Sequence, residues 1–136
     1  MLYDYLVQEN KTAFLEKVIR IASKLQIDPE WLMTVFKIES NVNHRAVNPY
    51  SGATGLIQFM PRTAAGLGTS TTALKNMSNV QQLDYVYKYF KRYTGRLHSI
   101  TDLYTVTFFP AALGKPDNYV LQTDTISAGK IASQNR

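Results

Sequence analysis

The sequence predicts a mainly α fold in a single domain. Its 136 residues suit one domain with one core, and a composition of 45% hydrophobic and 18% charged residues is typical of a globular chain. Apolar residues recur at helical spacing in several segments, whereas the period-two alternation that marks a strand is nearly absent. We therefore expect helices around one core within residues 1–136, with residues 115–136 mostly loop or tail.

The first half of the chain contains two clear helix patterns. Residues 2–8 are compatible with a short helix, and residues 11–25 place apolar side chains at helical spacing. Asp28-Pro29-Glu30 then predicts a helix start, because Asp28 can cap, proline suits the first position and Glu30 faces the positive end of the helix dipole. This helix should end near Ser40, since residues 41–55 are a loop rich in Asn, Ser and Gly.

The second half continues with helices. Pro61 can open a short helical turn, after which two glycines and a polar Thr/Ser stretch predict a loop. Ser78–Gln81 forms a capping box ahead of a strong amphipathic helix. A last helix should be capped by Thr101 or Asp102, and Pro110 should kink or end it, because proline lacks the amide proton that a helix interior needs.

Composition excludes several classes of protein. There is no cysteine, so disulfides and cysteine-based metal or redox sites are excluded. His44 and His98 stand alone, so we expect no metal, no cofactor, and a surface or loop place for both histidines. No apolar run approaches the roughly 20 residues that span a bilayer, which predicts no membrane insertion. The net charge of +5 favours polyanions in general, but nucleic-acid signatures are missing and we expect no nucleic-acid partner.

Glu39 is the most informative single residue. It shares a helix face with Leu32, Val35 and Phe36, so an apolar stripe ends in a carboxylate. Partial desolvation and the negative end of the helix dipole both favour the neutral acid and should raise its pKa. A raised carboxyl pKa suits a general acid near neutral pH. The alternative interpretation is a helix-end residue that bonds the following loop.

The segment that follows the loop combines glycines with one isolated amide. Gly52 and Gly55 allow tight turns and a close backbone approach. Gln58 is the single polar side chain between apolar neighbours, and its amide offers both a donor and an acceptor to a sugar N-acetyl or hydroxyl group. A structural amide that bonds its own loop is the equally weighted alternative.

These residues form a long ordered motif. Glu39-Ser40, a loop, and then the run Gly-Ala-Thr-Gly-Leu-Ile-Gln-Phe-Met-Pro-Arg-Thr-Ala over residues 52–64 resemble the signature of soluble lytic transglycosylases, the group related to goose-type lysozyme. Weaker blocks at residues 79–87 and 108–114 extend the resemblance over roughly residues 28–114. The resemblance implies a lysozyme-like domain with a substrate cleft between helices, and it implies that Glu39 is the catalytic acid/base.

The resemblance also implies which residues meet the glycan. Gln58 and Met60 would line the sugar site, Ser40 would support Glu39, and Ser51 or Asn48 would take the place of the serine that the family has before its Gly-Ala. The full set of residues expected at the substrate is Ser40, Asn48, Ser51, Gln58, Met60, Tyr87, Phe108 and Phe109.

One block departs from the family pattern. The family usually has Ala-Tyr-Asn-Ala-Gly where this chain has Phe109-Pro110 and its neighbours, so a phenolic hydroxyl is lost. A tyrosine from elsewhere would have to replace the hydrogen bond that this hydroxyl makes. The candidates are Tyr85, Tyr87, Tyr89 and Tyr104.

The expected function is cleavage of the MurNAc–GlcNAc β-1,4 bond of bacterial peptidoglycan. Glycosidases usually use two carboxylates, and no motif places a partner for Glu39. This favours a non-hydrolytic reaction that gives 1,6-anhydromuramoyl products. The alternatives are a hydrolytic lysozyme, with Asp102 or Asp117 as the second acid, and a wall-binding or structural module without turnover.

The sequence also bears on where the protein works. The start has no basic region followed by a long apolar one, so we see no signal peptide. The Phe-Phe-Pro-Ala-Ala run resembles variants in phage-encoded wall hydrolases. We therefore expect a monomer that is made in the cytoplasm and acts on the cell wall, as a phage lysis or virion-associated protein.

Overall fold

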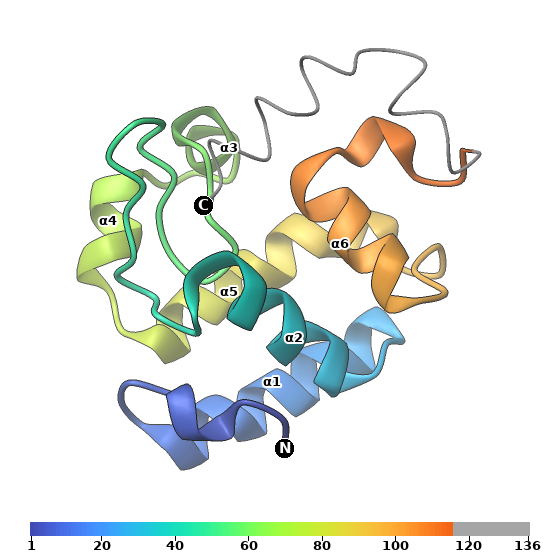
Figure 1. The fold of residues 1–136 in the computed structure, drawn as a ribbon, viewed down its shortest axis with the longest axis horizontal. Coiled ribbons are helices and arrows are strands. Elements are labelled where there is room, and N and C mark those ends of the chain that lie inside the picture. Colours follow the sequence, from blue (N-terminus) through green and yellow to red (C-terminus); the bar gives the residue numbers. More distant parts are fainter. Residues whose placement is uncertain (116–136) are drawn as a thin grey trace.

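A computed structural model describes residues 1–115, and every regular element in that part is helical (Figure 1). Residues 47, 54 and 59 form two isolated β-bridges, and no strand occurs between residues 1 and 115. The elements in chain order are η1 (Asp4–Leu6), α1 (Lys11–Leu25), α2 (Pro29–Ser40), α3 (Pro61–Gly66), α4 (Thr71–Asn76), α5 (Asn79–Phe90), η2 (Lys91–Tyr93), α6 (Ile100–Phe108) and η3 (Pro110–Ala112). The predicted mainly α fold is confirmed, whereas the tail predicted for residues 115–136 lies almost wholly outside the described residues.

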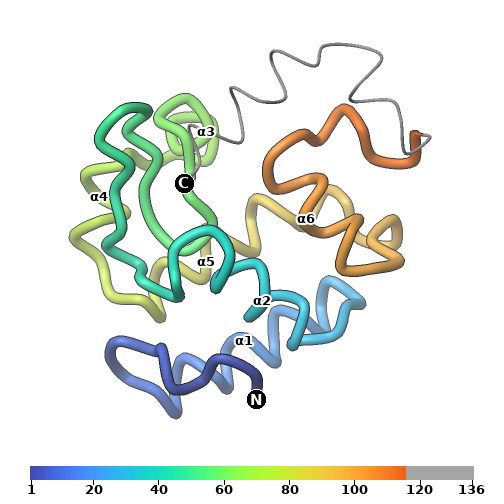
Figure 2. The backbone as a smooth tube through the Cα atoms, viewed as in Figure 1, coloured from blue at the N-terminus to red at the C-terminus, as the bar shows by residue number. Residues whose placement is uncertain are grey.

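The core lies where the four longest helices meet. α1 packs against both α2 and α5, and α6 packs against α2. Their fully buried side chains include Phe14, Val18, Leu25, Leu32, Phe36, Leu83, Phe90 and Leu103. Residues 41–60 lie with α3 and α4 on one side of the molecule and α6 lies on the other, so that the last turn of α2 is directed between them (Figure 2). No helix among the described residues has both the length and the apolar character needed to cross a membrane.

α2 carries Glu39, and both of its ends follow from local sequence. At the start, the Glu30 amide donates to the Asp28 carboxylate at 2.9 Å, which confirms the predicted cap. At the end, Asn41 and Val42 both adopt φ 58°, and the Val42 amide bonds back to the Phe36 carbonyl at 3.1 Å. A positive φ is strained for a β-branched residue, so the sharp turn after Glu39-Ser40 is held by tertiary packing, with Val42 only 2% exposed.

The structure corrects the sequence analysis at two helices. α6 begins at Ile100 and is capped by Ser99, whose Oγ accepts from the Asp102 amide at 3.1 Å, rather than by Thr101 or Asp102. α4 occupies part of the stretch predicted as a polar loop, because Ser70 caps it and Leu74 anchors it in the core. The capping box of α5 is confirmed, with Ser78 and Gln81 each bonding the other's backbone amide.

Candidate active site

Glu39 lies in the last turn of α2 with its side chain almost wholly removed from solvent. The residue is 7% exposed, and its Oε1 atom has no hydrogen-bond partner among the described residues. Burial raises the pKa of Glu39 to about 7, while a side-chain hydrogen bond with Tyr104 acts in the opposite direction. The raised pKa predicted from the apolar stripe is therefore present, and desolvation is its main cause.

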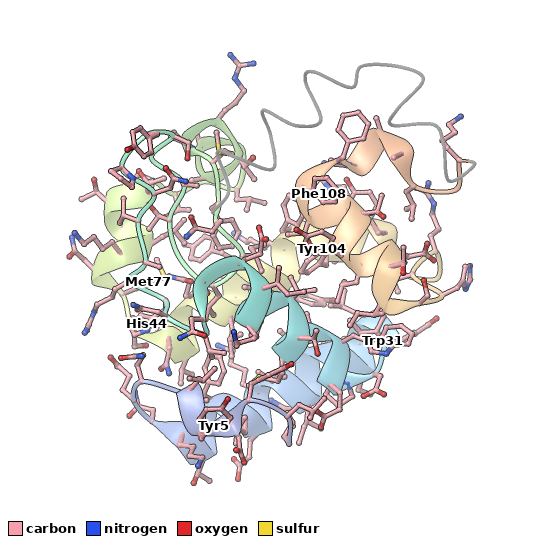
Figure 3. The ribbon with its side chains drawn as sticks, in the orientation of Figure 1. Tyr5, Trp31, His44, Met77, Tyr104 and Phe108 are labelled. Atoms are coloured by element: carbon pink, nitrogen blue, oxygen red, sulfur yellow. The ribbon has the colours of Figure 1, made fainter. Side chains whose placement is uncertain are left out.

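Tyr104 is the tyrosine whose hydroxyl interacts with the Glu39 side chain. It projects from α6 and hydrogen-bonds the Glu39 side chain, and its ring lies 4.8 Å from that of Phe108 (Figure 3). The other candidates are engaged elsewhere. Tyr89 donates to the Val106 carbonyl, and the rings of Tyr85 and Tyr87 lie under Lys88 and Lys24. Of the four tyrosines proposed as replacements, Tyr104 is the one whose contact reaches Glu39.

Removing this hydroxyl should raise the pKa of Glu39 further. A hydrogen bond from a phenol stabilises the carboxylate, so Tyr104→Phe disfavours ionisation and shifts the titration of Glu39 upward from about 7. The measurement is a carbon-detected NMR titration of the Glu39 carboxyl. Tyr93→Phe is the control, because the Tyr93 ring packs against Arg92 and Arg96. A downward shift in Tyr104→Phe would contradict the assigned hydrogen bond.

Ser40 joins α2 to the glycine-containing segment. Its hydroxyl lies 2.9 Å from the Leu56 carbonyl and 3.0 Å from the Phe36 carbonyl, and the residue is 9% exposed. The hydroxyl is thus used within the protein, where it ties α2 to Leu56. This placement fits the expected support of Glu39 more directly than a contact with sugar.

The polar residues predicted to meet the glycan are largely engaged in building their own loop. The Asn48 side-chain carbonyl oxygen accepts from the Tyr50 and Ser51 amides at 2.9 and 3.2 Å, and Ser51 Oγ accepts from the Ala53 amide at 3.2 Å. Gln58 adopts φ 56° and its Nε2 donates to the Ala46 and Gly55 carbonyls at 3.2 and 3.1 Å. These bonds match the structural interpretation of Gln58, in which the amide bonds its own loop.

The remaining predicted site residues fall in different places. The ring of Phe108 lies beside that of Tyr104, Phe109 is the first residue after α6, and Met60 is the partly buried residue before α3. Tyr87 instead contacts Lys24 on α1, 5.5 Å from ring centre to Nζ. The described contacts thus connect Phe108 with Glu39 through Tyr104, and they do not connect Tyr87 with it.

His44 lies in a loop, as one of the two predicted placements has it, but not at the surface. It lies in the loop after α2 but is fully buried, and its Nε2 is 3.4 Å from the Glu9 carboxylate. Burial lowers the pKa of His44, with Glu9 acting against that shift. Glu9 also lies 3.3 Å from the Arg45 guanidinium, and its carbonyl accepts from the Asn79 side chain at 2.6 Å. One N-terminal residue therefore supports the loop that follows Glu39.

Gln82 was not singled out from the sequence, although it makes three buried hydrogen bonds. It is fully buried on α5 and bonds Leu56, His44 and Leu74. Its position could have indicated this role, because Gln82 shares a helix face with Asn79 and Val86. A polar side chain on such a buried face needs hydrogen-bond partners inside the protein.

No second carboxylate pairs with Glu39 among the residues whose structure is described. Asp84 forms an ion pair with Lys17 at 2.8 Å, and Asp102 accepts from the His98 amide at 2.8 Å. Asp117 lies outside the described residues. Within residues 1–115 there is also no cluster of three His, Cys, Asp or Glu side chains that would hold a metal ion.

Comparison with protein families gives one match. Residues 16–104 match the family model described as "Transglycosylase SLT domain", a span that includes Glu39, the glycine-containing segment, Gln82 and Tyr104. No match was found among curated proteins or among solved structures.

Proposed function

The chain belongs to the transglycosylase SLT domain family, whose members are lytic transglycosylases acting on peptidoglycan, and on that basis we propose that Glu39 is its catalytic acid/base. The bond cleaved is the β-1,4 linkage between MurNAc and GlcNAc, and the product carries a 1,6-anhydromuramoyl end.

The observation that carries this proposal is the state of the Glu39 carboxyl. A pKa of about 7 keeps a substantial fraction of this acid protonated near neutral pH, and Oε1 has no partner among the described residues to compete with a substrate oxygen. Tyr104 bonds the same side chain from α6. A desolvated acid held by one phenol has the protonation and the orientation that proton donation to a leaving group requires.

The reaction uses the Glu39 carboxyl twice, first as an acid and then as a base. Glu39 first donates its proton to the glycosidic oxygen, and the bond from that oxygen to C1 of MurNAc breaks with GlcNAc as the leaving group. The Glu39 carboxylate then takes the proton of the MurNAc 6-hydroxyl as that oxygen bonds to C1. The 1,6-anhydro ring closes, Glu39 is again protonated, and no water is consumed.

The surroundings of Glu39 support ring closure over hydrolysis. Hydrolysis with inversion needs a second carboxylate about 6.5–9.5 Å from the acid, to activate water. Of the two candidates for that role, Asp102 accepts from the His98 amide and Asp117 lies outside the described residues, while Asp84 is paired with Lys17. Attack by the substrate's own 6-hydroxyl needs no such partner.

The product mass tests this chemistry. We expect muropeptides from purified peptidoglycan to be one water lighter than products with reducing ends, and to gain no ¹⁸O when the digestion is run in labelled water. Heat-treated protein and a hydrolytic muramidase serve as the two controls. Reducing ends that carry ¹⁸O would show hydrolysis and overturn the proposed product, whereas no released fragment at all would overturn the catalytic role.

A further inference from the structure

Gln82 connects three segments that are far apart in the sequence. It lies on α5 with no exposed surface, and its Oε1 accepts from the Leu56 amide at 2.7 Å. Both protons of its Nε2 are used, one for the His44 carbonyl and one for the Leu74 carbonyl, each at 2.9 Å. One side chain therefore satisfies three buried backbone groups, which would otherwise each be costly to leave unpaired.

The backbone of the glycine-containing segment packs directly on this amide. Gly55 has φ +89°, and a Cβ atom placed there would lie 2.5 Å from Gln82 Oε1 and 2.9 Å from Cδ and Nε2. Glycine is thus required at residue 55 for both its conformation and its lack of a side chain. The contact fixes the position of the peptide that leads into Leu56.

Leu56 is also held from the opposite side. Its amide donates to Gln82, and its carbonyl lies 2.9 Å from the hydroxyl of Ser40, the residue directly after Glu39. A continuous path of hydrogen bonds and backbone thus runs from Gln82 through Leu56 to the last turn of α2. We infer that Gln82 is a positioning residue for Glu39, which holds Leu56 against the end of α2 and so keeps the Glu39 carboxyl shielded from water.

This role explains why an amide occupies the position. A leucine or methionine would fill the space but would leave the Leu56 amide and two carbonyls without partners. An ionised glutamate would place a negative charge beside the carbonyls of His44 and Leu74, and it would have no proton to donate to them. Only a side chain with one acceptor and two donors satisfies all three groups. Release of Leu56 would let water reach Glu39, and its pKa would then fall toward the ordinary value of 4.5.

The test compares Gln82→Met with Asn79→Ala. Asn79 is a second buried amide on α5, but it bonds the Glu9 carbonyl and the Val80 amide rather than Leu56. Both variants should lose thermal stability. Only Gln82→Met should lower the pKa of Glu39, by about one unit or more, in a carbon-detected NMR titration well below the melting temperature. We also expect kcat to fall about tenfold or more with a smaller change in KM.

This inference rests on the proposed function, but the experiment distinguishes a failure of the positioning role of Gln82 from a failure of the catalytic role of Glu39. The NMR titration reports the environment of Glu39 whether or not Glu39 is catalytic, whereas an active Glu39→Gln variant would remove the proposed function alone. An unchanged pKa in folded Gln82→Met would overturn the positioning role. If Gln82→Met does not fold, Ser40→Ala breaks the other end of the same path. A lowered Glu39 pKa in that variant supports the inference, and an unchanged pKa overturns it.

Discussion

Replacement of Glu39 by glutamine is expected to reduce peptidoglycan cleavage by about 10²–10⁴-fold, the range typical of a lost general acid/base. Glutamine keeps the shape of the side chain and removes the proton that the leaving oxygen needs. The measurement is the rate of muropeptide release from purified walls, together with far-UV circular dichroism to verify the fold. Glu16→Gln makes the same chemical change at an exposed position of α1 and should retain full activity. More than a tenth of wild-type activity in Glu39→Gln would refute the assignment.

The same variant should change the pH dependence of stability. Because the folded-state pKa of Glu39 is raised from 4.5 to about 7, the native state binds the extra proton between these values. The stability of the wild type therefore falls as pH rises through this window. Glu39→Gln lacks this loss, which we place at about 2 kcal/mol after allowing for solvent screening. Melting temperatures at pH 5 and pH 8 measure it, and an equal decline in both proteins would contradict the shift.

The second large effect is expected from Gly55→Ala, which should lower the free energy of unfolding by about 3 kcal/mol or more. A left-handed φ costs an alanine about 1–2 kcal/mol, and the new Cβ must also displace the Gln82 amide. For a chain of this size the melting temperature should fall by about 10 °C. Denaturant titration with circular dichroism is the direct measurement.

Alanine substitutions at two other glycines distinguish the cost of the backbone conformation from the cost of the contact with Gln82. Gly68 has φ +83°, but a Cβ atom added there would meet no other atom within 4 Å, so Gly68→Ala reports the conformational cost alone. Gly66 lies in α3 with open space and no positive φ, and Gly66→Ala should be neutral or slightly stabilising. Equal losses in Gly55→Ala and Gly68→Ala would show that contact with Gln82 contributes nothing.

The parts of the site that were predictable from sequence have local causes. The bounds of α2 follow from Asp28, Pro29 and the turn after Ser40, and the buried state of Glu39 follows from the apolar stripe that it ends. Each of these signals lies within one helix. Periodicity and capping chemistry are therefore sufficient to locate the acid.

The partners of that acid were not predictable in the same way. Tyr104 is distant from Glu39 in the chain, and the sequence left it as one of four tyrosines. The bonds of Gln82 to Leu56 and His44 span 26 and 38 residues. The loop position of His44 was predictable but its burial was not, because that burial depends on Glu9 and α5 rather than on its neighbours in the sequence. Such contacts are determined by how helices meet, which periodicity does not specify.

The contacts of Glu9 bear on how this domain can be excised or recombined. The match to the family begins at residue 16, yet Glu9 touches His44, Arg45 and Asn79, and the Leu2 amide bonds the Glu30 carboxylate at 2.8 Å. The segment that matches the family model is thus smaller than the set of residues that these contacts hold together. A chimera cut at residue 16 would remove the contact of Glu9 with His44, whereas a junction placed ahead of η1 would keep Glu9 together with the loop that follows Glu39.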